Sequence, residues 1–239
     1  MMKALKIKLY QNLVNYRREM SFGYVQTYPL PTPSMVKGMA HALLDLQQYH
    51  NISISIQGRY DSVVTNMQKV YKFDIFRKER KDNPIIYVGN ARKQIITGVM
   101  FVDEIVDMEL LLHIAFDDED LTSKLYDAVR QKTVVLGRNE DIARVDFDDT
   151  KLVDTSKHEV DELTLPYDIY LSPELAKGSQ LVGTYYRLPF YYETVKSFED
   201  KRIFTYVDAV YITKDKTIGF SNITKDTDGC IVNLFSVKK

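Results

Sequence analysis

The residues best suited to binding chemistry stand near the N-terminus and combine cations, a phenol, a hydroxyl, a glycine and an imidazole: Arg17, Arg18, Tyr28, Ser34, Lys37, Gly38 and His41. Ser34 is expected to cap a helix over residues 35–49, whose free N–H groups and positive dipole end favour a phosphate. Lys37 opposes that dipole unless an anion is bound nearby. A capped helix with a solvated lysine and a hydrogen-bonded histidine explains the same residues, and the helix alone favours that explanation.

A second group of cations lies in residues 69–93, which hold 8 Lys and Arg against 3 Asp and Glu. Tyr and Phe side chains are interleaved with Arg77, Lys78, Arg80, Lys81, Arg92 and Lys93. Cations that neutralise phosphates, beside rings that stack on bases, are typical of single-stranded nucleic-acid binding. A solvated edge hairpin protected by lysines would have the same composition, so the two interpretations are equally consistent with this segment.

A weaker signal is the run Leu-Gly-Arg-Asn-Glu-Asp at residues 136–141. Gly137 allows close backbone approach, and Arg138 offers paired N–H donors to a phosphate or a base edge. A simple turn explains these residues almost as well. The chain carries no P-loop, nucleophile elbow or zinc-ligand spacing, so we expect no catalytic residue, no metal and no cofactor.

The charge is unevenly divided along the chain, although the net charge is only −1. Residues 1–102 hold 15 Lys and Arg against 6 Asp and Glu, whereas residues 103–239 hold 17 against 27. A basic half joined to an acidic half indicates a polyanionic ligand on one side and a different partner on the other. The single cysteine, Cys230, excludes an internal disulfide. The N-terminal residues favour a strand over a signal peptide, so we expect a cytoplasmic protein without a membrane partner.

Hydrophobic periodicity predicts the elements that position these groups. Strands are expected at residues 4–10, 52–56, 70–76, 94–101, 105–116 and 133–136, and helices at residues 35–49 and 117–131. This order predicts an α+β fold, a ferredoxin-like (RRM-like) domain over residues 1–145, with a protruding β-hairpin thumb at about residues 69–93. An acidic, structureless linker is expected at residues 144–165. Short strands at residues 184–192, 203–213, 217–222 and 231–237 would complete a small, mostly β lobe within residues 146–239.

Two motifs resemble a known family. Residues 28–41, Tyr-Pro-Leu-Pro-Thr-Pro-Ser-Met-Val-Lys-Gly-Met-Ala-His, follow a strand and an Arg-bearing loop, and the run at residues 136–141 follows later in the chain. Together they resemble the recurring elements of the CRISPR-associated "Cas-five" family of the RAMP superfamily. The resemblance implies an antiviral-defence subunit of a type I Cascade complex, closest in style to type I-B.

The resemblance further implies RNA as the ligand and other Cascade subunits as partners. The 5′ handle of the crRNA would be bound by residues of both motifs: Arg17, Arg18, Tyr28, Ser34, Lys37, Gly38, His41, Gly137 and Arg138. The protein would contact the first backbone subunit and the large subunit, near the protospacer-adjacent motif of target DNA. Family members of type I-C cut precursor crRNA without metal by Tyr, Lys and His side chains. Tyr28, Lys37 and His41 match that set by type, so a metal-independent endoribonuclease is the alternative, and a small-molecule-binding protein is a third possibility.

Overall fold

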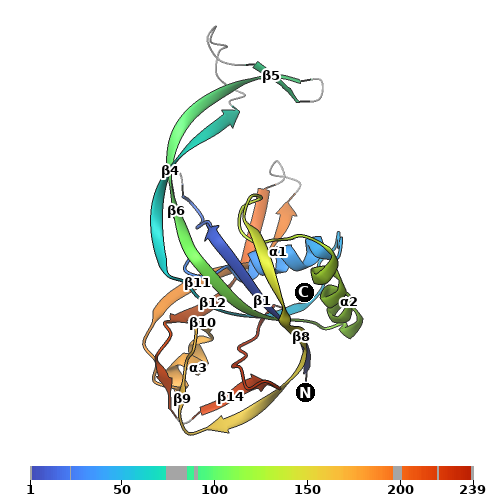
Figure 1. The fold of residues 1–239 in the computed structure, drawn as a ribbon, viewed down its shortest axis with the longest axis vertical. Helices are drawn as coiled ribbons and strands as arrows, with labels where there is room; N and C mark the ends of the chain where they lie inside the picture. The colour runs from blue at the N-terminus through green and yellow to red at the C-terminus, as the bar shows by residue number, and fades with distance from the viewer. Residues whose placement is uncertain are drawn as a thin grey trace.

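In the computed structural model, the described residues are 2–21, 23–73, 85–88, 91–195, 201–219 and 221–237, and most of them lie in strands. Within this part of the chain one curled sheet holds 13 strands (Figure 1). Its main path runs β11 (Thr184–Val195), β12 (Lys201–Ile212), β10 (Asp168–Leu171), β3 (Ile52–Arg59), β6 (Ala91–Phe116), β1 (Met2–Val14), β8 (Ile142–Val160) and β14 (Ser221–Asp226).

Shorter elements complete the sheet and cover it. Off the main path lie β2 (Tyr24–Val25), β4 (Ser62–Phe73), β5 (Ile85–Val88), β7 (Val134–Val135) and β15 (Phe235–Ser236). A separate ladder joins β9 (Leu163–Thr164) to β13 (Thr217–Ile218). The helices of the described chain are α1 (Pro33–Leu43), α2 (Glu119–Gln131) and α3 (Pro173–Gly178). None of them is long and apolar enough to cross a membrane.

The predicted ferredoxin-like α+β fold is wrong, because the chain is mostly β and builds one large curled antiparallel sheet. Strand β6 joins the segments predicted separately at residues 94–101 and 105–116 into 26 continuous residues. The stretch at residues 144–165, predicted to be structureless, is largely β8, which pairs with β1 on one side and β14 on the other. The predicted domain boundary at residue 145 falls within this strand.

The strand predicted at residues 4–10 is confirmed as part of β1, and its Leu5, Ile7 and Leu9 are buried in the main hydrophobic cluster. Leu110 and Leu112 of β6 lie in the same cluster, because β6 is a central strand that pairs with β3 on one side and β1 on the other. Helix α1 contributes Val36, Met39 and Leu43 to this core, and α2 contributes Leu121, Leu125 and Val129. The sheet and these two helices therefore share one core.

Helix α1 begins earlier and ends sooner than predicted. Thr32, not Ser34, is the N-cap, and its hydroxyl accepts a hydrogen bond from the N–H of Met35. Pro33 occupies the first helical turn, where its fixed φ is compatible with a helix and its missing N–H removes no intrahelical bond. The helix ends at Leu43, and Asp45 follows with a positive φ of 56°.

The sheet extends into an arm that points away from the helices (Figure 1). Its ladder joins β4 to the first part of β6, from Phe73 opposite Ile95 to Ser62 opposite Val106, so the described parts of the strands predicted at residues 70–76 and 94–101 pair with each other. Arg77, Lys78, Arg80 and Lys81 lie outside the described residues. Arg92 and Lys93 lie in β6, where only their backbone is described.

Candidate nucleic-acid interface

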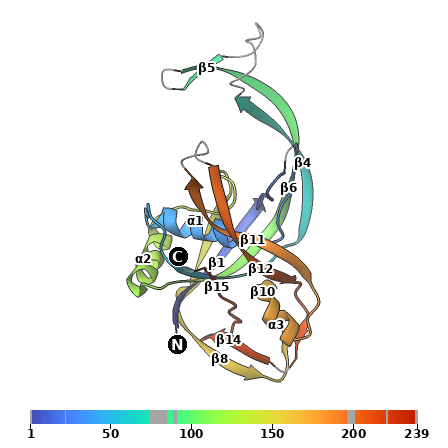
Figure 2. The same ribbon diagram turned by 180° about the vertical axis from the view of Figure 1, so that it is seen from behind.

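Cations and aromatic rings from distant parts of the chain meet around the hairpin formed by β11 and β12, which we name the aromatic hairpin. Its strands pair antiparallel from Thr184 opposite Tyr211 to Val195 opposite Lys201. The hairpin extends beside α1, with its free end beyond the body of the sheet (Figures 1 and 2). Its position brings the N-terminal third of the chain against residues that are more than 150 positions later.

Arg18 and Tyr28 meet at the inner side of this hairpin. The Arg18 guanidinium lies 5.5 Å from the ring centroid of Tyr28 and 5.9 Å from that of Tyr186 on β11. The two rings are 5.8 Å apart in an edge-to-face arrangement. Tyr28 is buried, and burial raises the pKa of its phenol. Tyr28 is therefore held as a neutral packing residue, with a cation over its ring.

Lys37 and His41 belong to a second aromatic cluster. The Lys37 ammonium lies 5.4 Å from the ring of Tyr49 and 5.8 Å from that of Tyr192 on β11. His41 stacks on Tyr49 with ring centroids 6.3 Å apart. Lys37 and His41 of α1 therefore lie on the side of the helix that contacts Tyr49 and, on the aromatic hairpin, Tyr192.

The His41 imidazole is occupied on both nitrogens. Its Nδ1–H donates to the carbonyl of Lys37 at 3.0 Å, and its Nε2 accepts from the backbone N–H of His50 at 3.4 Å. Burial lowers the pKa of His41, and the nearby Lys37 charge lowers it further, although the bond to the Lys37 carbonyl acts in the opposite direction. The ring is a neutral, hydrogen-bonded side chain, which is the structural alternative left open by the sequence.

The other residues of the first motif occupy different settings. Arg17 donates to the carbonyl of Ser21 at 2.9 Å and forms an isolated β-bridge with Thr27. Ser34 is half-buried in the first turn of α1, and Gly38 is exposed on the same helix. Arg17 therefore helps to shape the loop that carries Arg18.

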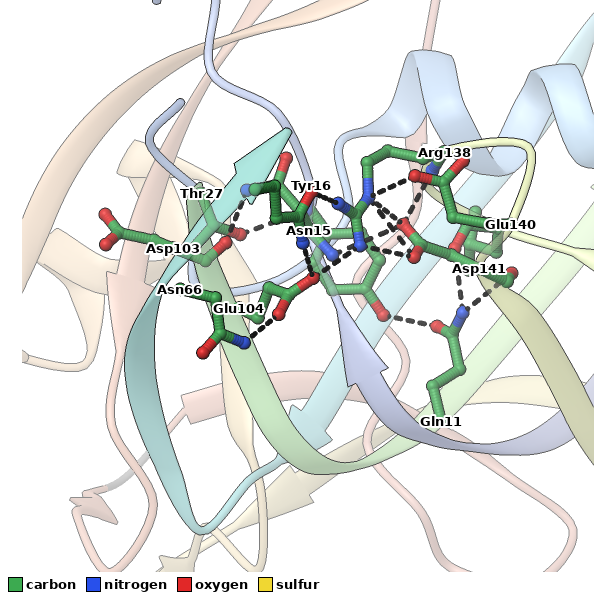
Figure 3. Close-up of polar contacts among 12 residues, drawn as sticks. Gln11, Asn15, Tyr16, Thr27, Asn66, Asp103, Glu104, Arg138, Glu140 and Asp141 are labelled. Carbon is green, nitrogen blue, oxygen red and sulfur yellow. Dashed lines mark hydrogen bonds and ion pairs between the residues drawn. The ribbon is translucent and has the colours of Figure 1, made fainter. Parts of the chain in front are cut away.

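Arg138, which follows Gly137 in the chain, belongs to a separate and largely internal cluster of polar side chains, which we name the Arg138 network (Figure 3). The Arg138 guanidinium donates to Glu104 at 2.7 Å and to Asp141 at 3.0 Å, and its Nη1 donates to Gln68 at 3.3 Å. Asp141 also accepts from the backbone N–H groups of Arg138 and Asn15. The carboxylates of Glu104 and Asp141 therefore accept the guanidinium N–H groups of Arg138 that the sequence analysis expected to bind a phosphate.

Backbone geometry explains why this turn needs glycine. Gly137 has a φ of +117°, and an added Cβ would lie 2.6 Å from Oδ2 of Asp141. The Gln11 amide donates to the carbonyls of Leu136 and Asp141, which joins the turn to β1. Residues 136–141 therefore form a turn that is held by hydrogen bonds to side chains of β1, β4 and β6.

The outer face of the aromatic hairpin was missed from the sequence. Five of its side chains form a continuous row, which we name the outer-face row: Arg187, Tyr192, Arg202, Phe204 and Tyr206. The signal available was the alternation Arg-Ile-Phe-Thr-Tyr over residues 202–206, which places three of these side chains on one face of a strand. It was interpreted only as a strand of the C-terminal lobe. No cluster that could hold a metal occurs among the described residues.

Solved structures that are similar to this chain include chains of two CRISPR complexes. The fold is similar to that of a chain in a "CRISPR RNA-guided surveillance complex", with a TM-score of 0.58 and 14% identity over 90% of this chain and 91% of that chain. A chain of the type III-B Cmr-beta complex bound to cognate target RNA has a TM-score of 0.44 and 16% identity, over 89% of this chain and 86% of that chain.

A search of curated proteins finds no match. The model of the family described as "CRISPR-associated protein (Cas_Cas5)" matches residues 4–172, which is more than half of the chain. This match includes both runs that carried the resemblance, residues 28–41 and 136–141. The chain therefore belongs to the CRISPR-associated protein (Cas_Cas5) family.

Proposed function

We propose that the chain is a non-catalytic RNA-binding subunit of a type I Cascade complex and that it binds the 5′ handle of the crRNA. The observation that carries the proposal is the convergence of Arg18, Tyr28 and Lys37 on the tyrosines of the aromatic hairpin. Of the rings that these cations meet, Tyr192 is exposed, and a cation beside an exposed ring neutralises a phosphate and supports a stacked base. Family membership and the fold shared with a chain of an RNA-guided surveillance complex support the same function.

The proposal extends to the assembly around the RNA. The arm formed by β4 and the first part of β6 would cover the handle together with the first backbone subunit. The large subunit, close to the protospacer-adjacent motif of target DNA, would contact acidic surface within residues 146–239. We assign the complex to type I-B and place it in the cytoplasm.

Endoribonuclease activity is the alternative, and His41 weighs against it. A general base needs a free nitrogen within reach of the proton that it removes. Both His41 nitrogens already have backbone partners, and Tyr28 packs in a different aromatic cluster from Lys37 and His41. The proposed subunit therefore holds RNA without cutting it.

Binding of a labelled repeat-derived RNA by the purified full-length chain tests both functions. We expect affinity to fall steeply as salt rises, because bound phosphates release counterions, and we expect the RNA to stay intact in EDTA. Absence of RNA binding, alone and with partner subunits, would contradict the proposal. Clean cleavage in EDTA that is lost in His41→Ala would establish the nuclease instead.

A further inference from the structure

The outer-face row lies on the side of the aromatic hairpin that the core does not use. Leu188, Tyr191 and Val207 point from the hairpin into or against the main hydrophobic cluster. Among the described residues, Tyr192, Phe204 and Tyr206 belong to no hydrophobic cluster. Tyr192 is exposed and Phe204 and Tyr206 are half-buried, so these three neighbouring rings lie outside the core. Lys37 approaches the Tyr192 ring, and the Tyr206 hydroxyl donates to Glu19 at 3.0 Å.

The register of the hairpin makes the row continuous. Tyr192 is directly opposite Phe204, and their ring centroids are 5.5 Å apart. Tyr206 follows two residues along β12 on the same face, 6.3 Å from Phe204. Two residues of a strand advance about 6.7 Å, which is comparable with the step between nucleotides in an extended single strand. The row therefore offers successive rings at a spacing suited to successive bases.

An arginine stands at each end of this row. The Arg202 guanidinium lies 4.6 Å from the ring centroid of Tyr192, and that of Arg187 lies 4.9 Å from the ring of Tyr206. Among the described residues neither arginine forms an ion pair, whereas Arg59 and Arg138 each pair with carboxylates. Asp208 lies directly opposite Arg187 in the ladder and still makes no ion pair with it. Both guanidinium groups keep donors for an anion while their planes cover rings.

We infer that the outer-face row stacks unpaired nucleotides of single-stranded RNA, with Arg187 and Arg202 on the flanking phosphates. This inference rests on the proposed function, because it names the part of the RNA that the hairpin binds. Aromatic rings and arginine also occur at protein contacts, but here each end of the row has a guanidinium group that forms no ion pair among the described residues, and the rings between them are spaced for stacked bases. The chemistry favours bases and phosphates.

A single-stranded RNA that contains 2-aminopurine tests the inference with the full-length chain, because the fluorescence of this base is quenched when it stacks. We expect the Phe204→Leu/Tyr206→Leu variant, which leaves Tyr192 and its contact with Lys37 in place, to bind about tenfold more weakly and to lose the quenching. Arg202→Gln should reduce the slope of log affinity against log salt by about one. Ile203→Ala, at an exposed position on the opposite face of β12, is the matched control and should behave as the wild type.

The outcomes separate the two proposals. If the wild type binds no RNA, both the proposed RNA-binding function and the stacking role of the outer-face row are wrong. If the wild type binds RNA but the double variant keeps its affinity and quenching, only the stacking row is wrong. Binding of the matching DNA strand alone would also overturn it. A double variant that binds RNA normally but fails to join partner subunits would identify the row as a protein contact.

Discussion

Arg138 shows how a residue suited to phosphate recognition can be used to hold a fold together. Its guanidinium is 20% exposed and faces the carboxylates of Glu104 and Asp141, which are 5% and 2% exposed. Removal of one partner from such a group leaves buried charge without compensation. We expect Arg138→Gln to lower the free energy of unfolding by about 3 kcal/mol in chemical denaturation.

Arg144 provides the control for this prediction. It is exposed and stacks on Tyr10 without an ion pair among the described residues, so Arg144→Gln should change stability by less than about 1 kcal/mol. A destabilised Arg138→Gln that keeps its RNA affinity when folded supports a structural role. If Arg138→Gln were as stable as the wild type but bound RNA more weakly, Arg138 would be an RNA-binding residue instead.

Gly137 is the second residue whose role can be measured. An alanine there would adopt an unfavourable positive φ and place its Cβ against Asp141 and Asn15. We expect Gly137→Ala to lower the thermal midpoint, with a cost of about 2 kcal/mol. Gly38→Ala, in α1 and with open space around its Cα, should instead stabilise the protein by about 0.5–1 kcal/mol. Equal effects of the two changes would contradict the strained turn.

His41 should make stability depend on pH. Since its folded pKa lies below the ordinary value of 6.5, the unfolded chain takes up the proton first as the pH falls. The contribution of His41 is therefore fully present above pH 6.5 and is lost as the pH falls through and below that value. We expect the unfolding free energy of His41→Gln to change less between pH 7.5 and 5.5 than that of the wild type. His158→Gln, at an exposed histidine on β8, controls for the loss of a histidine.

At the scale of elements, strands in which apolar residues alternate or run continuously could be predicted from the sequence. The strand β8, which is rich in Asp and Glu, could not. The buried alternation of β1 and the apolar centre of β6 identified them from sequence. In β8, Thr150, Val153 and Thr155 are buried, while Asp148, Asp149 and Asp154 lie on exposed positions. A register shift opposite Lys6–Lys8 interrupts the alternation, so a half-buried strand resembled a solvated loop.

Hydrogen exchange can distinguish these two descriptions of β8. Lys151, Leu152 and Val153 pair with Lys6, Leu5 and Ala4 of β1, next to the main core. We expect slow amide exchange across residues 151–155, as in central strands, because exchange requires the sheet to open. The backbone N–H groups of Gln47 and Gln48, which are exposed and have no acceptor among the described residues, should exchange fast in the same sample. Exchange across residues 151–155 as fast as at the control amides would contradict the strand and support the structureless linker predicted at residues 144–165.

The candidate interface was only partly visible from the sequence for a related reason. Arg18, Tyr28 and Lys37 were recognised because they stand close together in the chain. Their partners Tyr186 and Tyr192 come from β11, and only the folded sheet places that hairpin beside α1. Periodicity reports which face of a strand is buried, but it does not report which distant element covers the other face.

At the scale of the whole molecule, the sheet is ordered by long-range pairing. Strand β1 lies between β6 and β8, so its partners at Ile114 and Leu152 come more than 100 residues after Leu5. Such non-local pairing slows folding, because a long loop must close before its contacts can form. The same order places the N-terminal motif and the aromatic hairpin on one body.

The central position of β1 has a consequence during synthesis. A ribosome adds about 5–20 residues per second, so on the order of 10 s separates the emergence of β1 from that of both its neighbours. Throughout this interval an apolar strand with two unpaired edges is exposed to solvent, where it can pair wrongly or bind a chaperone. The yield of this protein should therefore depend on how fast its middle section is translated and on the chaperones present.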